Sequence, residues 1–215
     1  MTPVPRSPRV PDVLLAGAAG AVDLVALLHV GGSFASVVTG NLVLVGAGIA
    51  LLDLHRLLAP AVAVVGFAAG VAACALVWRR AADAVTGPLA VELVLLCSAF
   101  GVEALVTGRP ALLTLVLLST AMGAQSVAGL GLRAATTYMT GALTTALHGL
   151  LTGTGDPVRR RAWTAAWQLA ALVTGAVTAA VLSAAVRWLP LVLPVVLVGV
   201  AITVAARRTA PRPRS

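Results

Sequence analysis

The sequence predicts an all-α integral membrane protein, a helical bundle of six to eight spans. Hydrophobic residues make up 60% of the 215 residues and charged residues only 10%, whereas soluble domains carry about 25% charged residues. The mean hydropathy is +1.02. Apolar runs of about 18–24 residues recur along the whole chain, near the length that crosses a bilayer as a helix. Too little polar surface remains to cover a soluble globule.

The apolar runs set the expected spans, and the residues between them set the boundaries. Glycine, proline and charged residues gather in the gaps, as at Gly87-Pro88 and Asp156-Pro157, and these residues favour turns and helix starts. An uninterrupted run of about forty residues is too long for one span and is expected to fold back on itself. The predicted spans are 13–30, 34–52, 59–78, 89–107, 111–130, 134–152, 163–186 and 189–206.

The arginines predict the orientation of the chain. All 15 basic residues are arginines. With eight spans, eleven of them fall on the side of the N-terminus and four on the other side (Arg79, Arg80, Arg133 and Arg187). An excess of positive charge marks the cytoplasmic side of a membrane protein, so both termini are expected in the cytoplasm. The arginines sit in short gaps beside apolar runs, so we expect them to face the lipid bilayer and not nucleic acid.

The chain reads as one membrane domain, residues 13–206, between a cytoplasmic tail at 1–12 and a basic cytoplasmic tail at 207–215. Within it, Thr39-Gly40 recurs as Thr140-Gly141, each followed by a leucine two residues later. This echo predicts two repeats, 13–108 and 111–206, each with an interrupted Thr-Gly helix. Two halves of four spans would be parallel repeats, related by an axis along the membrane normal.

Asp23 is the most informative single residue. It lies near the middle of the first span, where an ionised carboxylate is expensive unless it is paired or hydrated. If the chain folds back near residue 32, Asp23 and Asn41 lie about 13 Å from the turn on either side, so a contact between them is expected. Gln125 and Thr140-Gly141 flank a second turn near residue 132 in the same way. This reasoning makes Gln125 the equivalent of Asp23.

These residues predict a binding site for a solute or ion between the two halves. Interrupted helices near a repeat interface hold small solutes or ions in many transporters, and Asp23 would carry the charge or a proton. Small and hydroxyl-bearing residues also serve helix packing, so a purely structural clamp remains the alternative. The candidate binding residues are Asp23, Thr39, Gly40, Asn41, Gln125, Tyr138, Thr140 and Gly141.

Other polar and small residues have simpler expected roles. Glu92 and Glu103 are eleven residues apart and share a face of one helix; their expected partners are Arg79 or Arg80 for Glu92 and Arg109 for Glu103. Gly66 and Gly70 have the spacing of helix-packing glycines. The histidines and cysteines match no metal-binding pattern. No motif indicates a metal, a cofactor or a catalytic set, so the chain is not expected to be an enzyme.

The residues around Asp23 also resemble a known family. Gly20 with Asp23, then Gly31-Gly32-Ser33-Phe34, then Thr39-Gly40-Asn41 is similar to the N-terminal signature of the YoaK family of bacterial membrane proteins. Gly123 with Gln125, followed by residues 137–141, resembles the second half of that family. The resemblance implies a multi-pass protein of the bacterial inner membrane, often drawn with about six spans, and supplies no substrate or reaction.

Two functions therefore compete. The first is a secondary transporter or channel for a small polar solute, proton-coupled through Asp23. The second is a scaffold or partner subunit in which the polar residues only fix helix packing; self-association stays open under both. A hydrated cavity that reaches Asp23 and Gln125 would favour the first function, and a dry core with Asp23 bonded only to Asn41 would favour the second.

Overall fold

The described residues fold into helices, without any strand. The computed structural model describes residues 10–80, 85–106, 110–132, 139–153 and 155–209. In chain order the elements are α1 (Val10–His29), α2 (Val38–Ala50), α3 (Leu54–Val77), α4 (Thr86–Leu105), α5 (Ala111–Leu132), α6 (Met139–Thr152), α7 (Asp156–Ala185), the short 3-10 helix η1 (Leu189–Leu191) and α8 (Val192–Thr209). The predicted all-α fold class is confirmed.

Within the described residues, six helical segments are long and apolar enough to cross a membrane: α1, α3, α4, α5, α7 and the η1–α8 segment. The protein is thus a multi-pass membrane protein with the lower of the predicted span numbers. The predicted span at 34–52 is wrong: it contains α2, which has 13 residues and so reaches only about 20 Å, short of the roughly 30 Å hydrocarbon core. The predicted span at 134–152 lies partly outside the described residues, and its described part is α6, with 14 residues.

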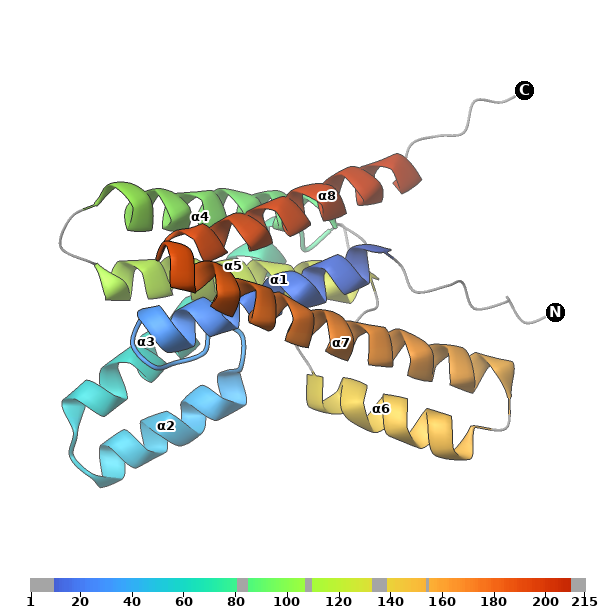
Figure 1. Cartoon of the computed structure of the whole chain (residues 1–215), viewed down its shortest axis with the longest axis horizontal. Helices are drawn as coiled ribbons and strands as arrows, with labels where there is room; N and C mark the ends of the chain where they lie inside the picture. Colours follow the sequence, from blue (N-terminus) through green and yellow to red (C-terminus); the bar gives the residue numbers. More distant parts are fainter. Residues whose placement is uncertain (1–9, 81–84, 107–109, 133–138, 154, 210–215) are drawn as a thin grey trace.

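The direction of the chain differs between the two halves. In Figure 1, α1 runs from right to left, whereas α5 runs from left to right. α2 and α6 both begin near the centre of the molecule and run outward to opposite ends, and each packs against the helix that follows it. The predicted parallel arrangement of halves is therefore wrong: each half holds three full spans, and an odd number reverses the direction of the second half.

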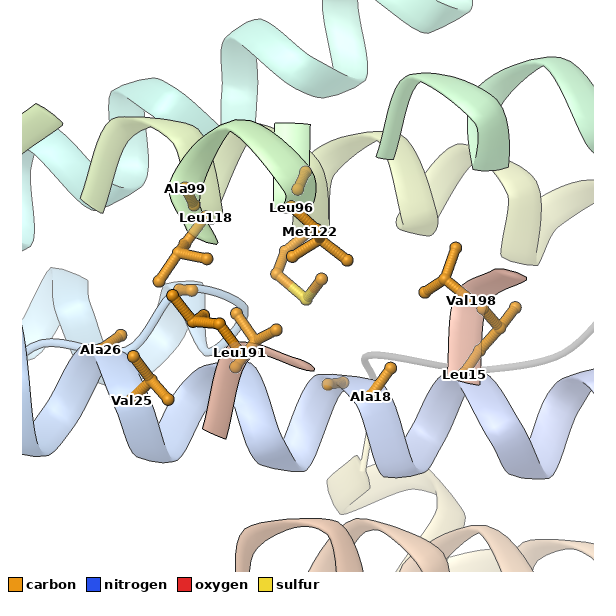
Figure 2. Close-up of a cluster of buried hydrophobic side chains, with 14 of the residues drawn as sticks. Leu15, Ala18, Val25, Ala26, Leu96, Ala99, Leu118, Met122, Leu191 and Val198 are labelled. Carbon is orange, nitrogen blue, oxygen red and sulfur yellow. The ribbon is translucent and has the colours of Figure 1, made fainter. Parts of the chain in front are cut away.

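α1 and α5 form the centre of the bundle. In the most apolar 18-residue stretch of each helix, 72% of the residues are buried in α1 and 56% in α5, against 17–33% in the other spans. Figure 2 shows their buried side chains meeting those of α4, η1 and α8, among them Leu15, Leu96, Met122 and Leu191. Lipid tails are as apolar as leucine, so close packing, and not removal from water, stabilises such a core.

Four glycines allow the closest helix contacts. A side chain at Gly20 of α1 would collide with the Leu172 carbonyl of α7, and one at Gly175 of α7 would collide with the Gly17 carbonyl of α1. The α3–α5 crossing repeats this arrangement, with Gly123 against the Phe67 carbonyl and Gly70 against the Thr120 carbonyl. Only glycine lets the backbones approach so closely. The predicted packing role of Gly66 and Gly70 is confirmed, since Gly66 lies against the Ser119 hydroxyl.

An ion pair closes one end of the bundle. Arg187, beyond the end of α7, lies 3.2 Å from the Glu103 carboxylate of α4 and donates to the His29 carbonyl of α1 at 2.5 Å. Thr114 of α5 donates to the other Glu103 oxygen at 2.8 Å. Glu103 was expected to pair with Arg109, which lies outside the described residues; its partner is Arg187, a residue far away in the sequence.

Candidate functional site

The site begins where α1 ends. Gly31 and Gly32 have positive φ angles of 119° and 72°, a backbone conformation that glycine adopts without strain. The predicted turn near residue 32 is confirmed. The chain then stays non-helical up to Val38, so residues 30–37 form a break between α1 and α2 inside the bundle. Backbone groups in such a break need partners, because hydrocarbon offers none.

Asn41 supplies two of these partners. Its side-chain oxygen accepts from the Phe34 N–H at 3.0 Å, and its side-chain nitrogen donates to the Phe34 carbonyl at 2.6 Å. The side-chain amide thus makes the two hydrogen bonds that a neighbouring peptide group would make, which explains an asparagine in an apolar stretch. The predicted contact between Asn41 and Asp23 is wrong, because the break gives each side chain a backbone partner closer at hand.

Asp23 binds the same break at another point. Its two carboxylate oxygens accept from Ser36, one from the backbone N–H at 2.7 Å and one from the hydroxyl at 2.6 Å. The residue is 8% exposed. Two hydrogen bonds to a carboxylate are among the stronger ones in proteins, so Asp23 fixes the segment that leads into α2.

Asp23 also faces a cavity of about 750 Å³. The cavity lies between α1, the break, α3, α7 and the first residues of both short helices. Its wall is mostly apolar, and the polar side chains in it are Asp23, Ser36, Thr39 and Thr140. The remaining lining residues are Gly20, Leu24, Leu27, Phe34, Val37, Val38, Val64, Phe67, Ala68, Met139, Gly141, Leu172 and Ala176.

Two helix N-termini meet at this cavity. Val38 and Thr39 begin α2, Met139 and Thr140 begin α6, and all four line the cavity. No side chain caps the start of α2 at Val37. The first N–H groups of a helix lack partners within the helix and carry the positive end of its dipole. The cavity is therefore flanked by two positive helix ends and one carboxylate.

The structure brings together four of the predicted binding residues: Asp23, Thr39, Thr140 and Gly141. Gly40 and Asn41 lie just behind the start of α2 and do not line the cavity, since Asn41 is turned to Phe34. Tyr138 lies outside the described residues. Within the described part of the chain, no group of three or more His, Cys, Asp or Glu could hold a metal ion.

Gln125 lies elsewhere. It is fully buried in α5, and its side-chain nitrogen donates to the Leu15 carbonyl of α1 at 3.2 Å. The helix crossings explain the error. Gly20 and Gly123 occupy matching places, and three residues beyond them stand Asp23 and Ser126. Counting from the predicted turns made Gln125 the equivalent of Asp23; counting from the glycine crossings makes it Ser126.

Sequence reasoning did not find the apolar wall. Phe67 and Leu172 line the cavity and also supply the carbonyls at the two glycine crossings. The paired spacing of Gly20 with Asp23 and of Gly123 with Ser126 was the available signal for the register of the two halves. Ser36, which lies in the break and also lines the cavity, is the main partner of Asp23.

The fold and the site define a helical multi-pass membrane protein in which two short helices begin at one cavity. The family described as "Protein of unknown function (DUF1275)" matches residues 13–204, and the chain belongs to this family. The resemblance to YoaK proteins agrees with this match. Neither a curated protein nor a solved structure matches the chain.

Proposed function

We propose that this protein is a secondary transporter or channel for a small solute, which binds in the cavity beside Asp23. The observation that carries the proposal is the meeting of the first residues of α2 and α6 and one carboxylate at a single cavity in the bundle. A helical scaffold needs neither the cavity nor two half-length helices. Interrupted helices at the middle of the membrane are how many transporters bind their substrates.

The wall of the cavity favours a solute with an apolar body and one polar group. Its volume of about 750 Å³ lies within the usual range of ligand sites, which are mostly apolar with a few placed polar groups. Phe34, Phe67 and Leu172 would contact the apolar part, and Thr39 and Thr140 would contact the polar group. The hydroxyls of both threonines lack a hydrogen bond within the described part of the chain.

The charges at the cavity leave room for proton coupling. Helix N-termini favour an anionic group, whereas the Asp23 carboxylate favours a cation or a proton. Asp23 is the ionisable side chain in the lining, so it is the group through which a proton would be coupled to solute movement. The Ser36 hydroxyl can donate to the carboxylate or accept from the protonated acid, so the hydrogen bond between Asp23 and the break can persist in both protonation states.

The two halves are best described as inverted repeats. Gly17 and Gly20 of α1 match Thr120 and Gly123 of α5, and both pairs are 103 residues apart; Phe67 and Gly70 of α3 match Leu172 and Gly175 of α7, both 105 residues apart. The cavity contains Phe67 and Leu172, and Thr39 and Thr140, so it lies on the interface between the repeats. Inverted repeats around a central site are a common design of secondary transporters.

The corrected span number strengthens the proposed orientation. With six spans, three arginines fall at the end where α1 stops (Arg56, Arg109 and Arg187). The other twelve of the 15 fall at the end of the two termini. This excess supports a cytoplasmic location of both termini and, with it, the proposal of a bacterial inner-membrane protein. The bilayer and the solute are the proposed partners, without nucleic acid, cofactor or catalysed reaction, and a homo-oligomer is compatible with the proposal.

A membrane scaffold is the second candidate, and one observation favours it. Asp23 and Asn41 both bond to residues of the break itself, so their polarity also serves local structure. A scaffold would keep these bonds and make no use of the cavity.

Osmotic swelling of proteoliposomes distinguishes the two candidates. Vesicles with and without the protein are shrunk with amino acids, carboxylate salts, polyols or inorganic salts, and solute entry is followed as reswelling by light scattering. Ala68→Phe fills the cavity, because Ala68 lines it, whereas Ala69→Phe places the same ring on the adjacent residue of α3, which does not. We expect at least one solute to enter faster with the wild type and the Ala69→Phe variant than with Ala68→Phe.

Equal entry with both phenylalanine variants would contradict transport through this cavity. Entry no faster than in protein-free vesicles for every solute would favour the scaffold.

A further inference from the structure

The carboxyl group of Glu92 in α4 is buried without a partner. Glu92 is 0% exposed, and neither of its oxygens has a hydrogen bond within the described part of the chain. An isolated ionised carboxylate in such surroundings costs far more free energy than a neutral carboxyl group. Neither Arg79 nor Arg80, the expected partners, forms an ion pair with it. A bound proton is the simplest way to remove this charge.

Gln125 has a buried acceptor without a donor. Its side-chain nitrogen donates to the Leu15 carbonyl, which fixes the amide, while its side-chain oxygen is buried and has no donor within the described residues. Buried polar atoms without partners are rare and ask for an explanation. Glu92 and Gln125 therefore both have buried side-chain oxygens without a hydrogen-bond donor.

The register of α4 and α5 places the two residues opposite each other. The two helices are antiparallel neighbours (Figure 1), and the contact between Glu103 and Thr114 fixes their alignment. Glu92 lies eleven residues before Glu103, and Gln125 lies eleven residues after Thr114. Eleven residues make about three turns. Because the helices are antiparallel, Glu92 and Gln125 lie at the same level of the bundle, on the helix faces that carry Glu103 and Thr114.

Within the described part of the chain, no ion pair joins Glu92 to a cation. α5 and η1 contain no ionisable side chain, α8 carries Arg207 near its C-terminal end, and α1 carries the buried Asp12 one turn before Leu15. On α3 the ionisable neighbour is the buried thiol of Cys74, which is within electrostatic range of Glu92. Glu103 on the same helix differs in this respect, because Arg187 balances its charge.

We propose that Glu92 and Gln125 form a proton-binding site inside the bundle, in which the protonated Glu92 carboxyl donates to the Gln125 side-chain oxygen. One proton gives both residues the hydrogen bond that each lacks. The site is separate from the cavity, whose lining includes neither residue. The proposal of a proton site is therefore independent of the proposed transport.

Labelling with N,N′-dicyclohexylcarbodiimide tests the site, because this apolar reagent reacts with protonated carboxyls. The carboxyl proton moves to a carbodiimide nitrogen, and the carboxylate oxygen adds to the central carbon. The O-acylisourea then rearranges to a stable N-acylurea, without any other reactant. The wild-type protein is labelled in detergent at neutral pH, and fragment-ion sequencing locates the adduct. We expect the adduct on Glu92 and none on Glu103.

Two further measurements distinguish a bound proton from a bound metal cation. The infrared carbonyl stretch of a protonated carboxyl should be lost in Glu92→Gln, kept in Glu103→Gln, and moved to higher frequency in Gln125→Leu, which removes the acceptor. An unlabelled Glu92 together with no change of this band in Glu92→Gln would overturn the proposal. Suppression of Glu92 labelling by Na⁺ at constant pH would also overturn it, in favour of a cation site. The labelling uses the wild type, so the test stands even if a variant fails to fold.

Discussion

The two halves of the molecule share a frame but not its polar chemistry. The α1–α7 and α3–α5 crossings use glycines and carbonyls at matching positions, and each half contributes one short helix to the cavity. In the first half Asp23 holds the break through Ser36; the matching residue in the second half is Ser126. The carboxyl groups of α4, Glu92 and Glu103, have no acidic counterpart in α8.

This difference separates the residues of the helix crossings, which recur in both halves, from the polar residues that occur in one half. Backbone contacts at the crossings recur because both halves need the same close approach of helices. Asp23 lines the cavity, and the residue at the corresponding place of the α3–α5 crossing is the neutral Ser126. Substitutions in the shared frame should therefore act equally in the two halves, and substitutions of the polar residues should not.

The largest effect is expected at the crossings. Gly70→Ala and Gly175→Ala each place a methyl group against a backbone carbonyl of the facing helix. Each should lower the free energy of unfolding in detergent by about 3 kcal/mol, the upper range for overpacking. Gly199→Ala in α8 meets nothing within 4 Å and should be neutral or slightly stabilising. A large loss in only one of the two crossings would break the comparison of the halves.

The next effect separates Asp23 from its counterpart. Asp23→Ala leaves the Ser36 N–H and hydroxyl buried without their acceptor and should cost about 2–3 kcal/mol. Ser126→Ala should change the free energy of unfolding by less than about 0.5 kcal/mol, as is usual where no special contact is lost. Thermal unfolding in the same detergent measures both. Equal losses of unfolding free energy in the two variants would show that Asp23 and Ser126 have the same structural role.

Arg187 should matter through the carboxylate that it balances. Arg187→Ala leaves the nearly buried Glu103 charge unpaired, which should cost about 2 kcal/mol after allowance for the partly exposed arginine. The double variant Arg187→Gln with Glu103→Gln removes both charges and should recover most of this loss. No recovery in the double variant would show that the ion pair does not account for the effect.

Asn41 should have a smaller effect that depends on its amide. Asn41→Ala removes both bonds to the partly buried Phe34 backbone and should cost about 1–2 kcal/mol. Asn41→Asp keeps an acceptor for the N–H but turns a carboxylate oxygen toward the Phe34 carbonyl, so it should not rescue stability at neutral pH. A fully stable Asn41→Asp protein would contradict the assigned bonds.

The smallest effect is expected at Glu92. Glu92→Gln replaces a neutral carboxyl by a neutral amide of the same shape, so the free energy of unfolding should change by less than about 0.5 kcal/mol. Glu103→Gln, three turns away, removes a paired charge and should be clearly destabilising. A large gain in stability from Glu92→Gln would mean that the wild-type residue carries a strained negative charge.

The sequence was sufficient for the fold class, because composition is a local signal, and it singled out Asp23, because an ionisable residue in an apolar run is one too. It did not reveal that the run 34–52 holds only a short helix, since the non-helical segment 30–37 is held in place by side chains of the flanking helices, Asp23 and Asn41. The register of the halves was also hidden: it is set by contacts such as that of Gly20 with the Leu172 carbonyl, which join residues far apart in the chain. The same holds for the pairing of Glu103 with Arg187.

Ligand-dependent stability of the purified protein is the most direct test of a solute site at Asp23. Thermal unfolding is recorded in detergent against amino acids, carboxylates, polyols and inorganic ions, for the wild type, Asp23→Asn, Thr140→Val and Thr203→Val. Thr140 lines the cavity, whereas Thr203 is exposed on α8 and bonds only within its helix. A ligand at one hundred times its Kd stabilises the folded state by about 2.7 kcal/mol. We predict a ligand whose stabilisation is kept in Thr203→Val and reduced in both Asp23→Asn and Thr140→Val. A shift of equal size in all four proteins, or none with any compound while Asp23→Asn merely melts earlier, would contradict the binding site and leave Asp23 as a structural clamp.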